Sequence, residues 1–211
     1  TIQCVNGNSF NFTNNTKIKN GNIATNKWLL GDNTFSSSIN VINKSYSTDD
    51  TFKVKLISIS NFGCIDSNEM TVVTNPSTFL KYNINFINQC FNEHQIDIKN
   101  LSSITKGTYN YFWELGDNST ETSLDIINKK YSTFGKYTVK LISITNNNCK
   151  DTLSKIITIN ESPKSKFTID KSKQCFRGNV FNFVNQSTYV QDPIAVYYWD
   201  LDNGFTSNST S

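Results

Sequence analysis

This chain of 211 residues repeats itself every 85 or 86 residues, and the repeat constrains its fold more than any other feature. A self-similar sequence places the same structural unit at each copy. The recurring landmarks are Gln3-Cys4, Trp28 and Cys64, then Gln89-Cys90, Trp113 and Cys149, then Gln174-Cys175 and Trp199. We therefore predict repeats at residues 1–76, 77–162 and 163–211, and expect the chain to be an excerpt in which the first repeat lacks its initial strand and the third is truncated.

Each repeat shows the pattern of short β-strands. Phe10 and Phe12 alternate with polar neighbours, and the same alternation recurs in both other copies, as expected for half-buried strands. A following strand carries the tryptophan and in two copies ends at Leu-Gly-Asp-Asn, a turn sequence. Six or seven short strands with a core tryptophan predict an all-β fold of immunoglobulin-like sandwiches. The residues assigned to cores and turns are Trp28, Trp113, Trp199, Tyr46, Tyr131, Gly31, Asp32, Gly116 and Asp117.

One strand in each of the first two repeats breaks the simple alternation. After Leu56 the apolar residues shift to Ile57 and Ile59, and the second repeat shifts in the same way after Leu141. A β-bulge would change the phase by one residue, and we expect a bulge here. The alternative is a strand that is apolar on both faces, which would offer Ile57 and Ile59 for lateral assembly of chains.

The sequence gives little support for catalysis or for binding of nucleic acid, metal or membrane. Its 20 basic and 17 acidic residues are dispersed, and Arg177 is the single arginine, whereas nucleic-acid binders cluster such residues. We place His94, the single histidine, on the surface of a polar loop. The acidic pair Asp49-Asp50 has no counterpart in the second repeat, so we expect no calcium site. We predict no catalytic residue, cofactor or metal, and no membrane insertion, because no run of eighteen apolar residues occurs.

The second repeat resembles the PKD (polycystic kidney disease) domain. The resemblance rests on Trp113-Glu-Leu-Gly-Asp-Asn118, on the series Tyr131, Gly135, Tyr137, Val139 and Leu141, and on Cys149-Lys-Asp151. A histidine typical of that family is replaced by Lys44 and Lys129 here. The resemblance implies tandem immunoglobulin-like sandwiches in a head-to-tail array. The cysteine-bearing variant is similar to repeats of very large Bacteroidetes surface proteins, which include gliding-motility adhesins and appendages exported by the type IX secretion system.

Five cysteines at repeat-locked positions indicate an oxidising, extracellular location and disulfide bonds. In an immunoglobulin-like sandwich, the cysteine before the second strand and the cysteine after the sixth lie at opposite ends, roughly 17 Å apart. A disulfide requires Cα atoms within about 7 Å, so we prefer a bond between neighbouring repeats. The preferred pair is Cys4 with Cys149, and the alternative pairs are Cys4 with Cys64 and Cys90 with Cys149. In the preferred scheme Cys64, Cys90 and Cys175 bond to cysteines outside this chain.

These features predict a non-enzymatic segment of a stalk or shaft in a secreted cell-surface adhesin or filament. Its partners would be neighbouring repeats of the same long chain, laterally associated chains, and a surface glycan, prey cell or substratum. The alternative is an accessory module that holds polysaccharide or protein for a secreted hydrolase. A polysaccharide-binding module would present a row of exposed aromatic side chains, whereas a stalk would not.

Overall fold

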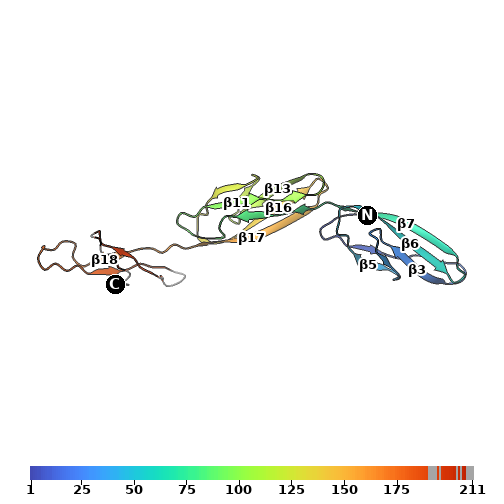
Figure 1. The fold of residues 1–211 in the computed structure, drawn as a ribbon, viewed down its shortest axis with the longest axis horizontal. Helices are drawn as coiled ribbons and strands as arrows, with labels where there is room; N and C mark the ends of the chain where they lie inside the picture. Colours follow the sequence, from blue (N-terminus) through green and yellow to red (C-terminus); the bar gives the residue numbers. More distant parts are fainter. Residues whose placement is uncertain (190–193, 195, 203, 205, 208–211) are drawn as a thin grey trace.

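The computed structural model describes residues 1–189, 194, 196–202, 204, 206 and 207, and every regular element in these residues is a β-strand. The strands form three groups that follow one another in a row, so the molecule is elongated (Figure 1). The fold is therefore all-β, with immunoglobulin-like sandwiches in tandem, as the repeat pattern predicted. Among the described residues no helix is long and apolar enough to cross a membrane.

The first repeat is a sandwich of a five-stranded sheet and a two-stranded sheet. The strand order is β1-β7-β6-β3-β4 in the larger sheet and β2-β5 in the smaller. The strands are β1 (Ile2–Cys4), β2 (Phe10–Phe12), β3 (Ile23–Leu29), β4 (Phe35–Ser36), β5 (Val41–Lys44), β6 (Thr51–Ser60) and β7 (Ile65–Asn75). Strand β1 runs parallel to β7, whereas the other pairs are antiparallel.

The second repeat has the same design with one strand more in its smaller sheet. The larger sheet has the order β10-β17-β16-β13-β14, the smaller β15-β11-β9, and a short pair β12-β8 lies beside them. The strands are β8 (Thr78–Phe79), β9 (Tyr82–Ile84), β10 (Asn88–Cys90), β11 (Ile96–Asn100), β12 (Ser103–Ile104), β13 (Tyr109–Glu114), β14 (Thr120–Glu121), β15 (Ile126–Lys129), β16 (Gly135–Thr145) and β17 (Lys150–Asn160). Strand β9 has no counterpart among the strands of the first repeat.

The third repeat shows two short antiparallel pairs. Strand β18 (Phe167–Ile169) pairs with β19 (Phe183–Asn185), and β20 (Trp199–Asp200) pairs with β21 (Thr206–Ser207). Trp199 is half-buried and packs against Phe167 and Phe183. Its burial is less complete than that of Trp113, which is fully buried.

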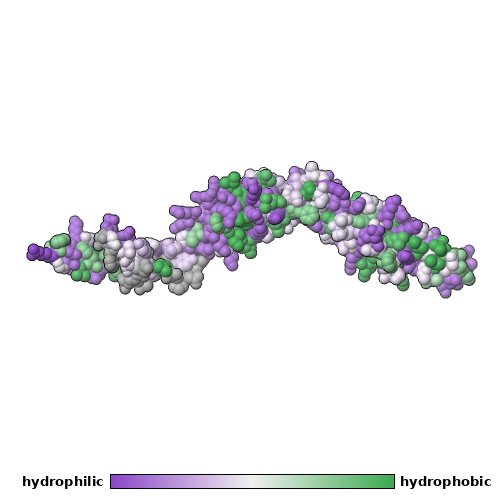
Figure 2. All heavy atoms as spheres, in the orientation of Figure 1, coloured by the Kyte–Doolittle hydropathy of each residue, from purple (hydrophilic) through white to green (hydrophobic). Residues whose placement is uncertain are grey.

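The first and the second sandwich each have their own apolar core. Trp28 and Tyr46 lie in the first core, and Trp113 and Tyr131 lie in the second, as we expected. The indole N–H of Trp113 donates to the carbonyl of Ser123 at 3.1 Å, which satisfies the polar atom of a fully buried ring. Apolar and polar side chains are interspersed over the visible face of both complete sandwiches (Figure 2).

The expected bulge after Leu56 is absent. Strand β6 pairs with β7 in one continuous register from Thr51 to Ile59, and β16 pairs with β17 without a shift. The core-facing positions after Leu56 are instead occupied by Ser58 and Ser60, which are buried. The phase of the apolar residues changes because serines face inward, so neither a bulge in this strand nor a second apolar face is needed to explain it. Lateral assembly through Ile57 and Ile59 stays a prediction.

Candidate functional site

The first and second repeats meet at a joint, which is formed by the linker between β7 and β8 and the residues around it. Cys4 is one of these residues. Strand β1 lies parallel to the last strand of its own repeat, and Cys4 pairs with Asn75, the final residue of β7. The chain leaves the first repeat at that point and enters β8 at Thr78. The parallel pairing therefore places Cys4 at the exit end of the sandwich, beside the linker.

Cys149 lies at the opposite end of its repeat, in the turn between β16 and β17. Its N–H donates to Thr145 Oγ1 at 3.0 Å, and its carbonyl accepts from the Thr145 N–H at 2.9 Å. Asn148 has a φ of 59° in this turn, in the left-handed region that asparagine tolerates. Cys149 is fully buried.

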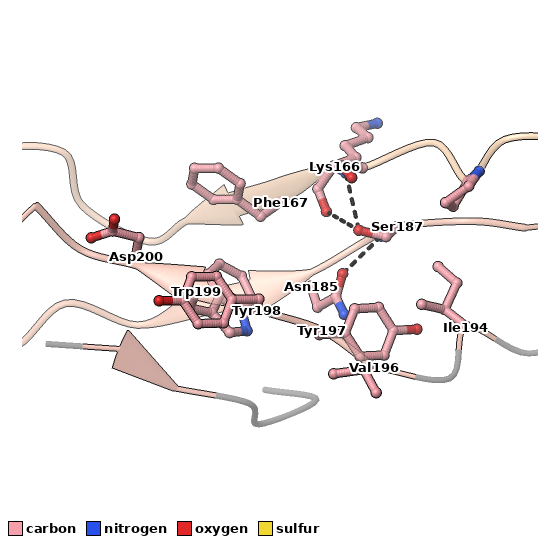
Figure 3. A pocket seen from close by; sticks show the side chains of 12 residues that line it. Lys166, Phe167, Asn185, Ser187, Ile194, Val196, Tyr197, Tyr198, Trp199 and Asp200 are labelled. Atoms are coloured by element: carbon pink, nitrogen blue, oxygen red, sulfur yellow. Dashed lines mark hydrogen bonds between the residues drawn. The ribbon is translucent and has the colours of Figure 1, made fainter. Parts of the chain in front are cut away.

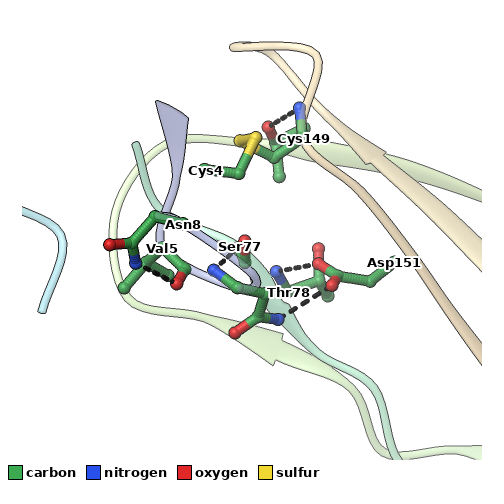
Figure 4. The surroundings of a disulfide bond; sticks show 9 residues. Cys4, Val5, Asn8, Ser77, Thr78, Cys149 and Asp151 are labelled. Atoms are coloured by element: carbon green, nitrogen blue, oxygen red, sulfur yellow. Dashed lines mark hydrogen bonds between the residues drawn. A yellow bond between two sulfur atoms is a disulfide. The ribbon is translucent and has the colours of Figure 1, made fainter. Parts of the chain in front are cut away.

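Cys4 and Cys149 form a disulfide bond between the two repeats (Figure 4). Their Cα atoms are 5.6 Å apart, within the range that an S–S bond requires. The preferred pairing is confirmed, and the alternative pairs of Cys4 with Cys64 and of Cys90 with Cys149 do not form. Cys64, Cys90 and Cys175 are exposed free thiols in this chain.

Asp151, two residues after Cys149, also contributes to the joint, through two hydrogen bonds (Figure 4). Its Oδ1 accepts from Asn6 Nδ2 at 2.8 Å, and its Oδ2 accepts from the backbone N–H of Thr78 at 2.9 Å. The N–H of Asn6 donates to Oγ of Ser77 at 3.3 Å. One carboxylate thus binds both the first repeat and the linker. The sequence carried a signal for it, because aspartate follows the cysteine by two residues in both complete repeats.

A second contact bridges the joint at Asp49. Lys106 lies 3.5 Å from Asp49 Oδ2 and donates to the Asp49 carbonyl at 3.2 Å. Thr105 donates to the same carboxylate at 3.4 Å. The Asp49 side chain is mostly buried, with 15% exposure, while that of Lys106 is 69% exposed. The acidic pair Asp49-Asp50 therefore includes a residue of the joint, a role that the sequence did not indicate.

The Gly-Asp turns combine a close backbone approach with an ion pair. A Cβ atom on Gly31 would lie 2.9 Å from the backbone of Lys53, and one on Gly116 would lie 2.7 Å from that of Thr138. Asp32 Oδ1 accepts from the N–H of Thr34, which is the turn cap that the sequence predicted. The ion pairs are Asp32 with Lys44 at 2.5 Å and Asp117 with Lys129 at 2.6 Å.

These contacts shift the pKa values of the turn and core side chains. Burial alone would raise the pKa of Asp32 and Asp117, but hydrogen bonds from the paired lysine and a neighbouring hydroxyl outweigh it, so both pKa values lie below the usual 3.8. Tyr46 donates to the Leu30 carbonyl at 2.7 Å. Burial, with a smaller effect of the Asp32 charge, raises the pKa of Tyr46 to about 12.

His94 was expected on the surface, and that expectation was wrong. The ring is 5% exposed, and its Nε2 accepts the backbone N–H of Tyr131 at 2.7 Å. Because a backbone N–H can only donate, Nδ1 carries the ring proton and donates to the Phe91 carbonyl at 2.7 Å. Asn8 makes the equivalent pair of bonds in the first repeat, to Val5 and Tyr46. His94 is thus a structural connector with both nitrogens engaged.

The third repeat contains an open pocket of about 340 Å³ (Figure 3). Aromatic side chains of Phe167, Tyr197, Tyr198 and Trp199 line it, together with Ser187, which is hydrogen-bonded to Lys166. Two of these side chains, Phe167 and Trp199, pack against each other with their ring centroids 5.6 Å apart. No cluster of three or more histidine, cysteine, aspartate or glutamate residues suited to a metal ion occurs in the part of the chain described.

Comparison with known families identifies the second sandwich. A sequence model described as PKD domain matches residues 88–160, from the start of β10 to the end of β17. This part of the second repeat is similar to a PKD domain. The match includes Cys90, Cys149 and Asp151, so two of the three belong to the joint. A PKD domain joined by a disulfide to its neighbour indicates an extracellular protein.

Solved structures resemble the chain at low sequence identity. One is the PKD1 domain of Vibrio anguillarum Epp, with a TM-score of 0.32 and 16% identity, where the match covers 41% of this chain and 95% of that one. Another is the Clostridium thermocellum CbhA fibronectin(III)-like modules, with a TM-score of 0.33 and 12% identity, where the match covers 76% of this chain and 88% of that one. A third is the three N-terminal domains of the bacteriophage RB49 outer capsid protein Hoc, with a TM-score of 0.35 and 15% identity, where the match covers 96% of this chain and 74% of that one. A search of curated proteins found no match.

Proposed function

We propose that this chain is a stiffened segment of an extracellular stalk, in which PKD-like repeats space a distal part of the protein from its anchor. The coarser conclusion, an extracellular structural or binding module, follows from the PKD domain and the sandwich fold. The stalk role is supported by one observation above others, the disulfide between the first and second repeats. A bond within one repeat would stabilise that repeat alone, whereas this bond acts on the joint.

The joint has two covalent connections rather than one. The backbone passes from Asn75 through Pro76 to Thr78, and the disulfide adds a second path from Cys4 to Cys149. Proline restricts the linker, and Ser77 and Thr78 are buried in the joint. The second path removes motions that a single linker would allow, and the contacts of Asp151 and Asp49 restrict the rotation that remains.

The contacts of Cys4 and Asn6 at the end of the first repeat recur at the end of the second repeat. Cys90 pairs with Asn160 at the end of β17, as Cys4 pairs with Asn75. The N–H of Asn92 donates to Ser162 Oγ at 3.0 Å, which repeats the bond between Asn6 and Ser77. We therefore expect Cys90, Cys64 and Cys175 to bond to cysteines of further repeats in the parent protein.

We propose that this segment is non-catalytic and that it belongs to a cell-surface adhesin or appendage exported by the type IX system; the resemblance of its cysteine-bearing repeats to those of Bacteroidetes surface proteins supports this proposal. His94, the single histidine of the chain, supports a structural role because both of its ring nitrogens bond to the backbone. The partners that we propose are neighbouring repeats of the same chain and laterally associated chains.

An antibody raised against this chain tests the proposal on source cells, by gold labelling and by a blot of the intact polypeptide. Label along surface filaments, together with a very large band, supports the stalk. A modest band released into the medium, with unlabelled cells, would contradict it and favour an accessory module of a secreted hydrolase.

A further inference from the structure

Asn6 connects the first repeat to the second through its side-chain amide. Its Nδ2 donates to Asp151 Oδ1 at 2.8 Å, and its backbone N–H donates to Oγ of Ser77 at 3.3 Å. The other oxygen of the same carboxylate, Asp151 Oδ2, accepts from the N–H of Thr78 at 2.9 Å. A carboxylate at Asp151 can only accept hydrogen bonds, so the contact requires an N–H donor on the side chain of residue 6.

Gly7 follows Asn6 in an exposed turn. Its φ is 75°, and among the described residues nothing accepts a hydrogen bond from its N–H. Because glycine has no side chain, nothing on residue 7 prevents its nitrogen from approaching Cγ of Asn6. The turn does not require glycine, since the second repeat forms the equivalent turn with Glu93 at a φ of 67°.

We propose that Asn6 is a site of spontaneous deamidation, and that its conversion weakens the hydrogen bonds of Asp151 across the joint. The Gly7 nitrogen attacks Cγ of Asn6, an N–C bond forms, the proton of Gly7 passes to solvent and Nδ2 leaves as ammonia. Water then opens the five-membered imide at either carbonyl, which gives aspartate or isoaspartate. The reaction consumes one water and releases one ammonia, and no group is oxidised or reduced.

The conversion replaces a hydrogen-bond donor by a negative charge at the joint. Both products carry a carboxylate at residue 6, which has no N–H to offer Asp151 and repels its charge at neutral pH. Asp151 therefore moves away from residue 6, and its bond to the N–H of Thr78 weakens. The disulfide of Cys4 with Cys149 still holds the two repeats together. This effect needs only the joint and does not depend on the stalk role.

The closed joint slows the same reaction. The atom that leaves as ammonia, Nδ2 of Asn6, is the atom that donates to Asp151, so this bond must break during the reaction. A hydrogen bond to a charged group is costly to lose, and its loss adds to the barrier. Asn20-Gly21 is an internal reference, because both residues are exposed and Asn20 bonds to no carboxylate among the described residues.

Incubation of the oxidised chain at mildly alkaline pH, followed by peptide mass spectrometry, tests the site. Asn6 should convert to aspartate and isoaspartate. Gly7→Glu, which copies the turn of the second repeat, should slow the conversion at least about tenfold. Asp151→Ala should speed the conversion of Asn6 by at least about threefold and leave that of Asn20 unchanged. Absence of conversion at Asn6, or a rate that either substitution leaves the same, would overturn the proposal.

Amide hydrogen exchange at Thr78 tests the effect on the joint, because its N–H donates to Asp151. Asn6→Asp, which carries the charge of the product, should speed this exchange at least about tenfold at neutral pH relative to the parent chain. Asn6→Gln is the neutral control and should change the exchange less. The N–H of Thr158, which donates to the Ile87 carbonyl at 2.7 Å, is an internal reference. Equal exchange of Thr78 in the two variants would overturn the proposed effect.

Discussion

At the scale of single residues, the first and second repeats satisfy equivalent buried polar groups with different side chains. Asn8 accepts the backbone N–H of Tyr46, and His94 accepts the equivalent N–H of Tyr131. Lys44 and Lys129 each pair with the aspartate of the Gly-Asp turn in their own repeat. The chemistry at each position is preserved although the residue differs. This equivalence supplies matched variants for testing each contact.

The connector role of His94 predicts a difference between two substitutions. His94→Ala should lower the free energy of unfolding of the second repeat by about 1–3 kcal/mol, because the buried N–H of Tyr131 loses its acceptor. His94→Asn should cost less than half as much, since Asn8 makes the same bonds in the first repeat. Urea unfolding of both variants measures this, and equal losses would show that the hydrogen bonds are not the cause.

The Asp117–Lys129 pair predicts acid sensitivity. The pKa of Asp117 is lower in the folded chain than the usual 3.8, so the pair stabilises the fold above that value and loses its contribution as the pH falls through the folded pKa. Asp117→Asn should therefore reduce stability at pH 7 by about 1–2 kcal/mol and have a smaller effect at pH 3. Urea unfolding at both pH values is the measurement. A loss of the same size at pH 3 would contradict the assignment.

At the scale of the strands, sequence periodicity predicted most of the fold but failed at one inward-facing stretch. The alternation around Phe10 and Phe12 located a strand because each core position there is apolar. After Leu56 the inward positions are Ser58 and Ser60, and an inward serine is indistinguishable from an outward one in a hydropathy pattern. The hydropathy pattern therefore changes phase although the backbone of the strand stays regular, and the predicted bulge does not exist.

The turn after β3 gives a test at this scale. Gly31→Ala places a Cβ atom 2.9 Å from the backbone of Lys53, whereas a Cβ on Gly63 meets nothing within 4 Å, although the φ angles are similar at 84° and 80°. Gly63→Ala should cost about 1 kcal/mol from the left-handed backbone alone. Gly31→Ala should cost at least about 2 kcal/mol more. The free energy of unfolding of both variants, measured in urea, tests this. Equal losses would show that the contact of the new Cβ atom with Lys53 is not the cause.

At the scale of the whole molecule, the covalent part of the joint was predictable and its polar part was not. The pairing of Cys4 with Cys149 followed from reach, because strand length separates the two ends of one sandwich. The contacts of Asp151 with Asn6 and of Lys106 with Asp49 depend on the rotation of one sandwich relative to the next. No periodicity within a repeat encodes that rotation, so these residues emerged only from the structure.

The joint gives the last prediction. In the chain with both Cys4→Ser and Cys149→Ser, each sandwich keeps its own core, so both should remain folded while the angle between them varies more widely. Spin labels on exposed residues, for instance Ile42 and Ile127, would report this as a broader distribution of distances than in the disulfide-bonded chain. Asp151→Ala, in the oxidised chain, is the matched control and should leave the distribution narrow, because the covalent path persists. If the double serine variant is as narrow as the parent chain, the polar contacts alone fix the joint, and the disulfide is not what stiffens the segment.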